Sequence, residues 1–272
     1  MKSIALGQYY PSKSILHRLD PRIKILLAIL YIVCSFLCSN VISFVALALS
    51  SLIIILIGRI PLKVILGGLR PVLIILVFTT VINIFWTRGE TLLVSWKFIN
   101  IYLEGVYSAI FIIIRITSLI IGTSLFMTYT TTPIELTDGI EDILSPLKKL
   151  HVPVHDFAMM MSIVLRFIPA LSEETEKIMT AQKSRGADFT NGNLLKRARA
   201  LIPILVPLFV SAFRRSDELA TAMECRCYHG GNGRTRMTVT YMKARDYFAL
   251  AMYVVFIVCL IALNFIDFGF SL

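Results

Sequence analysis

Two arginines in the second half of the chain occur in closely similar surroundings, 41 residues apart. Arg185 follows "EKIMTAQKS" and Arg226 follows "DELATAMEC". A guanidinium group presents five N–H donors in a rigid plane, which suits bidentate binding of a carboxylate. Residues of this type, repeated in this way, could hold acidic groups of a partner at two equivalent places.

A simpler explanation exists for each arginine taken alone. A cation in the last turn of a helix complements the negative end of the helix dipole, for about 0.3–1 kcal/mol. The repetition favours binding, because small neighbours leave both guanidinium groups unobstructed. Two such ends indicate a partner with two related grooves, and therefore a dimer or pseudo-dimer. The flanking residues are Ser184, Gly186, Cys225 and Cys227.

The elements that position these arginines are two long helices. The hydrophobic pattern predicts one helix over 154–185 and another over 194–228, each ended by a segment rich in glycine and asparagine. At 1.5 Å per residue, each is about 50 Å long. The first half of each is apolar and the second half is charged. Kinks are expected at the prolines within them, Pro169, Pro203 and Pro207.

A shorter helix is expected before these two. The sequence "TPIE" has the form of a capping box, with Thr132 as the N-cap, Pro133 in the first helical position and Glu135 reaching back. Apolar residues at spacings of three and four follow it. The three helices together form one predicted coupling domain.

The composition indicates a membrane protein. Of 272 residues, 57% are hydrophobic and only 16% are charged, whereas soluble domains carry about 25% charged residues. The formal charge of +10 could suggest a nucleic-acid partner, but uninterrupted apolar runs argue against one. An excess of positive charge is expected on the cytoplasmic segments of membrane proteins.

Five apolar runs are long enough to cross a bilayer as helices, and the first two form a tight hairpin. The predicted fold is thus an all-α membrane protein with about five transmembrane helices and a cytoplasmic or interfacial coupling domain of three helices, two of them long and kinked. The expected domains are 1–127, 128–246 and 247–272. A rival with seven spans would place the apolar halves of both long helices in the bilayer. The predicted spans are Ile23–Ser39, Val41–Ile57, Pro71–Trp86, Gly105–Met127 and Tyr247–Ile266.

Basic residues in the loops predict the orientation. Arg18 and Arg22 precede the first span, and Arg59, Lys63 and Arg70 separate the second from the third, whereas the tip of the first hairpin is uncharged. This alternation places the N-terminus in the cytoplasm and, after five spans, the C-terminus outside.

The chain resembles the transmembrane (T) component of energy-coupling factor transporters, a class of ABC importers. The matching phrases are "SILHRLDPRIKI", "TTPIEL", "SIVLRFIPALSEETEKIMTAQKSRGAD" and "LIPILVPLFVSAFRRSDELATAMECRCY", which follow the family's order over nearly the whole chain. In that family an Ala-Arg-Gly-like triplet ends each coupling helix and sits in a groove of one ATPase subunit. The resemblance implies that Ser184–Arg185–Gly186 and Cys225–Arg226–Cys227 are these triplets, although neither keeps the usual alanine.

The resemblance further implies what surrounds the chain. It predicts a non-enzymatic coupling subunit in the cytoplasmic membrane of a prokaryote, which contacts two ABC ATPase subunits, identical or different, and a substrate-binding S component. The cargo would be a vitamin or a transition-metal ion. ATP and magnesium would be bound by the ATPases, because this chain has no GxxxxGK[ST] loop and is predicted to bind no cofactor.

The sequence offers little support for catalysis or metal binding. Cys225, Cys227 and His229 resemble a metal site only faintly, since residues two apart on a helix point in different directions. A membrane enzyme would need a polar cluster at the membrane edge, and His151, His155 and Asp156 fit a turn between helices better. An ABC permease that encloses its own substrate path is the alternative within transport.

Two other charged groups invite an expectation. Arg115 lies in the middle of the fourth span, where a charge is costly; either it serves function or it makes a structural contact such as an ion pair. Arg214 and Arg215 stand beside Asp217 and Glu218, and a solvated helix face with salt bridges along it is expected there.

Overall fold

The computed structural model describes residues 9–12, 14–87, 91–96, 99–187, 189, 193–230 and 241–264. They fall into two compact units. The bundle unit contains the described residues up to Gly139 and those after 240, and the long-helix unit contains those from Ile140 to Gly230. The division falls within α5, Pro133–Ile143.

The first two helices of the bundle unit form the hairpin that the sequence predicts. Helix α1 covers Pro21–Leu37 and α2 covers Val41–Gly58. The side chain of Asp20 caps α1 by accepting a hydrogen bond from the Arg22 backbone N–H, with Pro21 in the first turn. A short uncharged connection then reverses the chain into α2.

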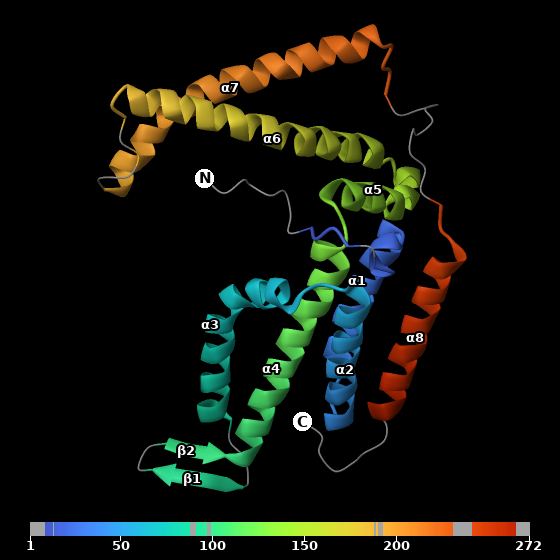
Figure 1. Cartoon of the computed structure of the whole chain (residues 1–272). Coiled ribbons are helices and arrows are strands. Elements are labelled where there is room, and N and C mark those ends of the chain that lie inside the picture. Colours follow the sequence, from blue (N-terminus) through green and yellow to red (C-terminus); the bar gives the residue numbers. More distant parts are fainter. Residues whose placement is uncertain are drawn as a thin grey trace. The chain divides into compact units, whose positions relative to one another are not determined.

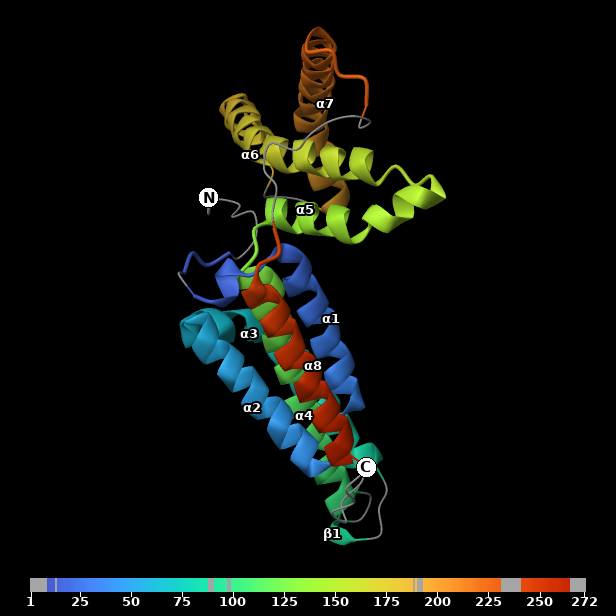
Figure 2. The ribbon, with the colours of Figure 1, turned by 90° about the vertical axis from the view of Figure 1, so that its right-hand side faces the viewer.

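Helix α4 is the centre of the bundle unit. It packs against α1, α2 and α3, whereas α8 packs against α1 and α2 (Figures 1 and 2). Aromatic rings fill the space between these helices: Tyr31 lies 6.2 Å from Phe126 and 6.3 Å from Tyr253, measured between ring centroids. The remaining bounds are Leu62–Trp86 for α3, Leu103–Thr123 for α4, Ser124–Tyr129 for the π-helix η2 and Ala244–Asn264 for α8.

A close approach at Gly122 makes this packing testable. A Cβ atom at position 122 would overlap the ring of Tyr31, which is fully buried, whereas a Cβ at Gly67 in α3 would meet nothing within 4 Å. Alanine favours a helix over glycine by about 1 kcal/mol, but overpacking a core costs about 1–3 kcal/mol. We expect Gly122→Ala to lower the thermal unfolding temperature in detergent and Gly67→Ala to leave it unchanged or raise it. Equal effects would contradict this packing.

Buried polar contacts hold one end of the bundle unit together. The Lys24 Nζ atom donates to the carbonyl of Thr130 at 2.7 Å and to that of His17 at 3.3 Å. Asp246 accepts from the backbone N–H of Asp20 at 3.1 Å. Thr130 precedes α5 and Asp246 lies in the first turn of α8, so the cluster ties together the segments next to those where the chain leaves this unit and returns to it.

Among the residues that the structure describes, five helices are long and apolar enough to cross a membrane, and four of them match predicted spans. The fifth is α6, which the sequence predicts to belong to the cytoplasmic or interfacial coupling domain and which only the rival with seven spans places in the bilayer. The helix runs unbroken through Pro169 for 31 residues, and this continuity accounts for the difference. The first predicted span is not among the five, because α1 has 17 residues, the lower limit for a crossing. Orientation stays a prediction.

The connection between α3 and α4 contains an element that the sequence did not predict. Strands β1, Leu92–Trp96, and β2, Ile99–Tyr102, pair antiparallel in a small hairpin. In the part of the chain that the structure describes, both units are helical as predicted, and the strands are confined to this connecting segment.

The long-helix unit contains α6, Val154–Ser184, and α7, Leu194–Cys225, both close to their predicted bounds. The two helices pack against each other, and in Figure 1 they run in opposite senses. The described chain before α6 forms a short helix, η3, Ser145–Leu150. The capping box that begins α5 is confirmed, since Thr132 and Glu135 exchange side chain-to-backbone hydrogen bonds of 3.1 and 3.3 Å.

Candidate functional site

The two predicted arginines stand at the ends of α6 and α7 and cap them in the same way. Arg185 and Arg226 are the C-cap residues, with similar backbone angles: φ −87° and ψ 6° for the first, φ −94° and ψ 15° for the second. The residue after each is left-handed, Gly186 at φ +88° and Cys227 at φ +57°. The backbone therefore turns away at the same point in both helices.

The hydrogen bonds of the two ends also correspond one to one. The N–H of Gly186 donates to the Lys183 carbonyl, and that of Ala187 to the Gln182 carbonyl, both at 3.0 Å. In α7 the matching donors are Cys227 and Tyr228, at 2.8 and 3.0 Å, to the carbonyls of Glu224 and Met223. This pattern is a Schellman motif, so the end of each helix is fixed by backbone bonds without help from the arginine side chain.

Both guanidinium groups are consequently available. Arg185 and Arg226 are exposed, and neither side chain makes an ion pair or hydrogen bond with another residue that the structure describes. Ser184, Gly186, Cys225 and Cys227 are exposed as well, so no neighbouring side chain covers the arginines. A planar cation on a rigid, projecting turn suits insertion into a groove with a carboxylate.

One ion pair links α6 and α7 at matching positions in their second halves. The Arg215 Nη2 atom donates to Glu174 Oε2 at 2.7 Å, across 41 residues of sequence. This corrects the expectation that Arg215 pairs along its own helix with Asp217 or Glu218. The spacing equals that between Arg185 and Arg226, so Glu174 and Arg215 are themselves equivalent positions of the repeat.

The geometry of the crossing follows from that equivalence. Arg185 lies eleven residues after Glu174, and Arg226 lies eleven residues after Arg215. At 1.5 Å per residue, each arginine is about 16 Å along its helix from the Glu174–Arg215 ion pair. Figure 1 shows the C-terminal end of α6 on the left and that of α7 on the upper right. Each helix thus extends equally far beyond the Glu174–Arg215 ion pair and ends in the same cation.

Arg115 is remote from this arrangement in sequence and has a contact of its own in the bundle unit. Its Nη2 atom donates to the Cys38 carbonyl at 2.8 Å, and its Cζ atom lies 5.0 Å from the centre of the Phe44 ring. Cys38 is the C-cap of α1, where a cation is favourable. The observed partners of Arg115 are thus the Cys38 carbonyl and the Phe44 ring. Among the described residues, Arg115 forms no ion pair.

Of the residues considered for an enzyme, only His151 lies in the turn between helices, whereas His155 and Asp156 lie in the first turn of α6. His155 Nδ1 lies 3.1 Å from Glu141 Oε1, and Lys148 Nζ lies 3.8 Å from the same oxygen. His151 is the left-handed cap that ends η3. Within the described ranges, no three His, Cys, Asp or Glu side chains are placed to hold a metal ion.

Sequence comparison identifies the family. Residues 12–239 match the family described as cobalt transport protein, CbiQ. The chain belongs to this family of transporter transmembrane components. It is 49% identical over 270 residues to the energy-coupling factor transporter transmembrane protein EcfT of Clostridium kluyveri, covering 99% of each chain. The EcfT proteins of Brevibacillus brevis and Bacillus subtilis are 50% and 46% identical over 246 residues, or 90% of this chain and 92% of theirs.

Membership of the CbiQ/EcfT family agrees with the resemblance drawn from the four sequence phrases. The match covers α1 to α7 almost completely, including both arginine triplets. The chain is thus a membrane component of an energy-coupling factor transporter. The Glu174–Arg215 contact was not foreseen, although extending the 41-residue comparison backwards from Glu176 and Asp217 would have placed opposite charges at these positions.

Proposed function

We propose that this chain is a non-catalytic coupling subunit that passes ATP-driven motion from two ABC ATPase subunits to a separate substrate-binding membrane protein. Arg185 and Arg226, with their flanking residues, would each enter a groove of one ATPase. ATP and magnesium would be bound by those partners. The observation that carries the proposal is the pair of matched helix ends, each with an exposed arginine that makes no ion pair in the described chain.

The crossed helices give a physical route for the motion. When two ATPases close on ATP, their grooves approach each other and the two seated ends must move with them. Because α6 and α7 are long and joined at Glu174 and Arg215, displacement of the ends changes the angle of the crossing. The apolar first halves of both helices then move as well, and these would support the substrate-binding protein.

The cargo follows from the relatives rather than from any site in this chain. The family is described as cobalt transport protein and the relatives are named as energy-coupling factor components, which favours a transition-metal ion or a vitamin. The spans contain few polar side chains, whereas a transporter that binds its own substrate needs a polar site near the midplane. A separate substrate-binding subunit is therefore proposed.

Reconstitution tests this function directly. The chain should be co-expressed with the ABC ATPases and candidate substrate-binding membrane proteins of the same genome, purified as a complex and placed in liposomes. We expect ATP-dependent uptake only when all components are present, and no substrate binding by this chain alone. Substrate binding by the purified chain would instead support the permease alternative.

A further inference from the structure

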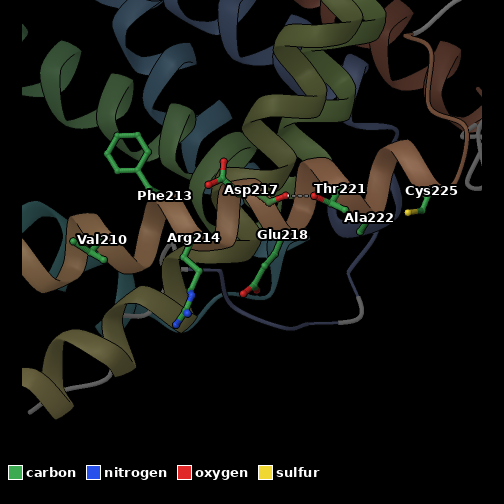
Figure 3. A pocket seen from close by; sticks show the side chains of 8 residues that line it. All are labelled: Val210, Phe213, Arg214, Asp217, Glu218, Thr221, Ala222 and Cys225. Carbon is green, nitrogen blue, oxygen red and sulfur yellow. Dashed lines mark hydrogen bonds between the residues drawn. The ribbon is translucent and has the colours of Figure 1, made fainter.

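The equivalence of α6 and α7 extends over a whole face before each arginine. One shallow hollow on α6 is lined by Glu173, Glu176, Lys177, Thr180, Ala181 and Ser184. Adding 41 to each number gives six of the eight residues that line a hollow on α7 (Figure 3). Thr180 and Thr221 even donate the same hydrogen bond, at 2.8 Å, to the carbonyl four residues earlier.

Charged positions differ in sign between the two helices, although the residues that line each hollow carry the same net charge of −1, because Glu173 of α6 is replaced by Arg214 in α7. Two cations near the end of α6 are replaced by acids at the matching places of α7: Lys177 corresponds to Glu218, and Lys183 to Glu224. All four side chains are exposed, and none makes an ion pair with another described residue. The charge has the same sign in both helices at two other pairs of positions, Glu176 with Asp217 and Arg185 with Arg226.

The last turns before the backbone reverses therefore differ strongly in charge. From Glu176 to Ala187 the α6 end carries one acid and three cations; from Asp217 to Tyr228 the α7 end carries three acids and one cation. The net charges are +2 and −2. The ends share their backbone conformation and one arginine but carry opposite formal charge over these twelve residues.

Helix stability does not account for Glu224 in the last turn of α7. A cation in the last turn is favourable and an acid there is unfavourable because of the helix dipole, yet the last turn of α6 carries Lys183 and that of α7 carries Glu224. In addition, Cys227 is left-handed at φ +57° where the equivalent residue is a glycine. The α7 end thus departs from local preferences at exposed positions, which is typical of a binding surface.

We propose that this charge inversion determines which ATPase groove each helix end enters. The α6 end fits a groove with a carboxylate for Arg185 and an acidic rim facing Lys177 and Lys183. The α7 end fits a groove with a carboxylate for Arg226 and a basic rim facing Glu218 and Glu224. Like charges across an interface strongly disfavour the wrong pairing, so the two ATPases bind in one orientation. This inference rests on the proposed function.

Crosslinking tests the assignment, because positions 184 and 225 are equivalent. In the intact complex, one variant keeps Cys225 and carries Cys227→Ser. The other carries Ser184→Cys with Cys225→Ser and Cys227→Ser. A thiol-directed photocrosslinker then reports the neighbour of each end, with the two ATPases distinguished by mass tags. The other cysteines should not label the ATPases, since Cys34 and Cys38 are buried and Cys259 lies in the apolar helix α8.

We expect the two positions to label different ATPase subunits, each with at least about tenfold preference. Equal labelling of both subunits from both positions, or a pair of identical ATPases, would overturn the inference while leaving the coupling role intact. If neither position labelled an ATPase subunit in an intact complex, the coupling role itself would be overturned.

Charge variants then test the cause of the preference. Lys177→Glu with Lys183→Glu should reduce labelling from position 184 at least about tenfold and leave labelling from 225 unchanged. Adding Glu218→Lys and Glu224→Lys should exchange the two labelled subunits. Lys196→Glu makes the same kind of change in the first half of α7 and should alter neither. A labelling pattern that ignores all four substitutions would show that the charges do not set the orientation.

Discussion

Replacing Arg185 and Arg226 together by alanine is expected to abolish ATP-driven uptake and to release the ATPase subunits from the complex. Truncating one member of a buried, hydrogen-bonded charge pair costs about 2–5 kcal/mol, which is at least about thirtyfold in affinity. The two arginines lie on separate helix ends, each about 16 Å along its helix from the Glu174–Arg215 ion pair, so their losses should add.

The single variants should be much less severe. When one end stays seated, the other remains close to its groove, and the high local concentration partly compensates for the missing contact. We expect reduced but measurable uptake from Arg185→Ala or Arg226→Ala and none from the double variant. Uptake in proteoliposomes and recovery of ATPases with the tagged chain are the measurements.

A matched control removes two other exposed arginines from the same helices. Arg166 is exposed in the first half of α6 and Arg199 in the first half of α7. Arg166→Ala with Arg199→Ala should leave ATPase association unchanged. If the Arg185→Ala/Arg226→Ala chain retained its ATPases and its uptake, the arginines could not be the points of coupling.

What could be predicted from the sequence was mainly what depends on neighbouring residues. The capping box at Thr132, the ends of α6 and α7 and the α1–α2 hairpin all follow from side chains within a few positions of one another. Such signals act through backbone hydrogen bonds of the same segment. The repeated arginines were visible for the same reason, since each belongs to the last turn of its own helix.

What the sequence did not reveal depends on contacts between distant segments. Arg115 binds the Cys38 carbonyl, and Ser43 donates to the side chain of Asn264 at 2.7 Å. Neither contact has a periodic or local signal, because each arises only when α4 and α8 pack against the first hairpin. The partner of Arg215 was misassigned because nearby acids in α7 looked sufficient, while Glu174 is brought close only by the crossing.

Reversing the charge of Glu174 should uncouple uptake from ATP hydrolysis. Glu174→Arg places two guanidinium groups at the point where α6 and α7 cross, and their repulsion should open the contact. Because both side chains are partly exposed, the pair contributes little to overall stability, about 0–1 kcal/mol. The expected loss is therefore in coupling: uptake per ATP hydrolysed should fall about tenfold, while the ATPases stay bound through the two arginines.

The double exchange, Glu174→Arg with Arg215→Glu, restores opposite charges at the crossing and should recover most of the uptake. Spin labels at Ser184→Cys and Cys225, with Cys227→Ser, would report the distance between the helix ends. We expect a broader distance distribution for the Glu174→Arg variant and a return to the original one for the exchange. A chain with the exchanged pair that is as poorly coupled as the single variant would show that the crossing does not depend on this contact. Recovery, in contrast, would mean that the angle between α6 and α7 transmits the motion, and not only the attachment of their ends to the ATPases.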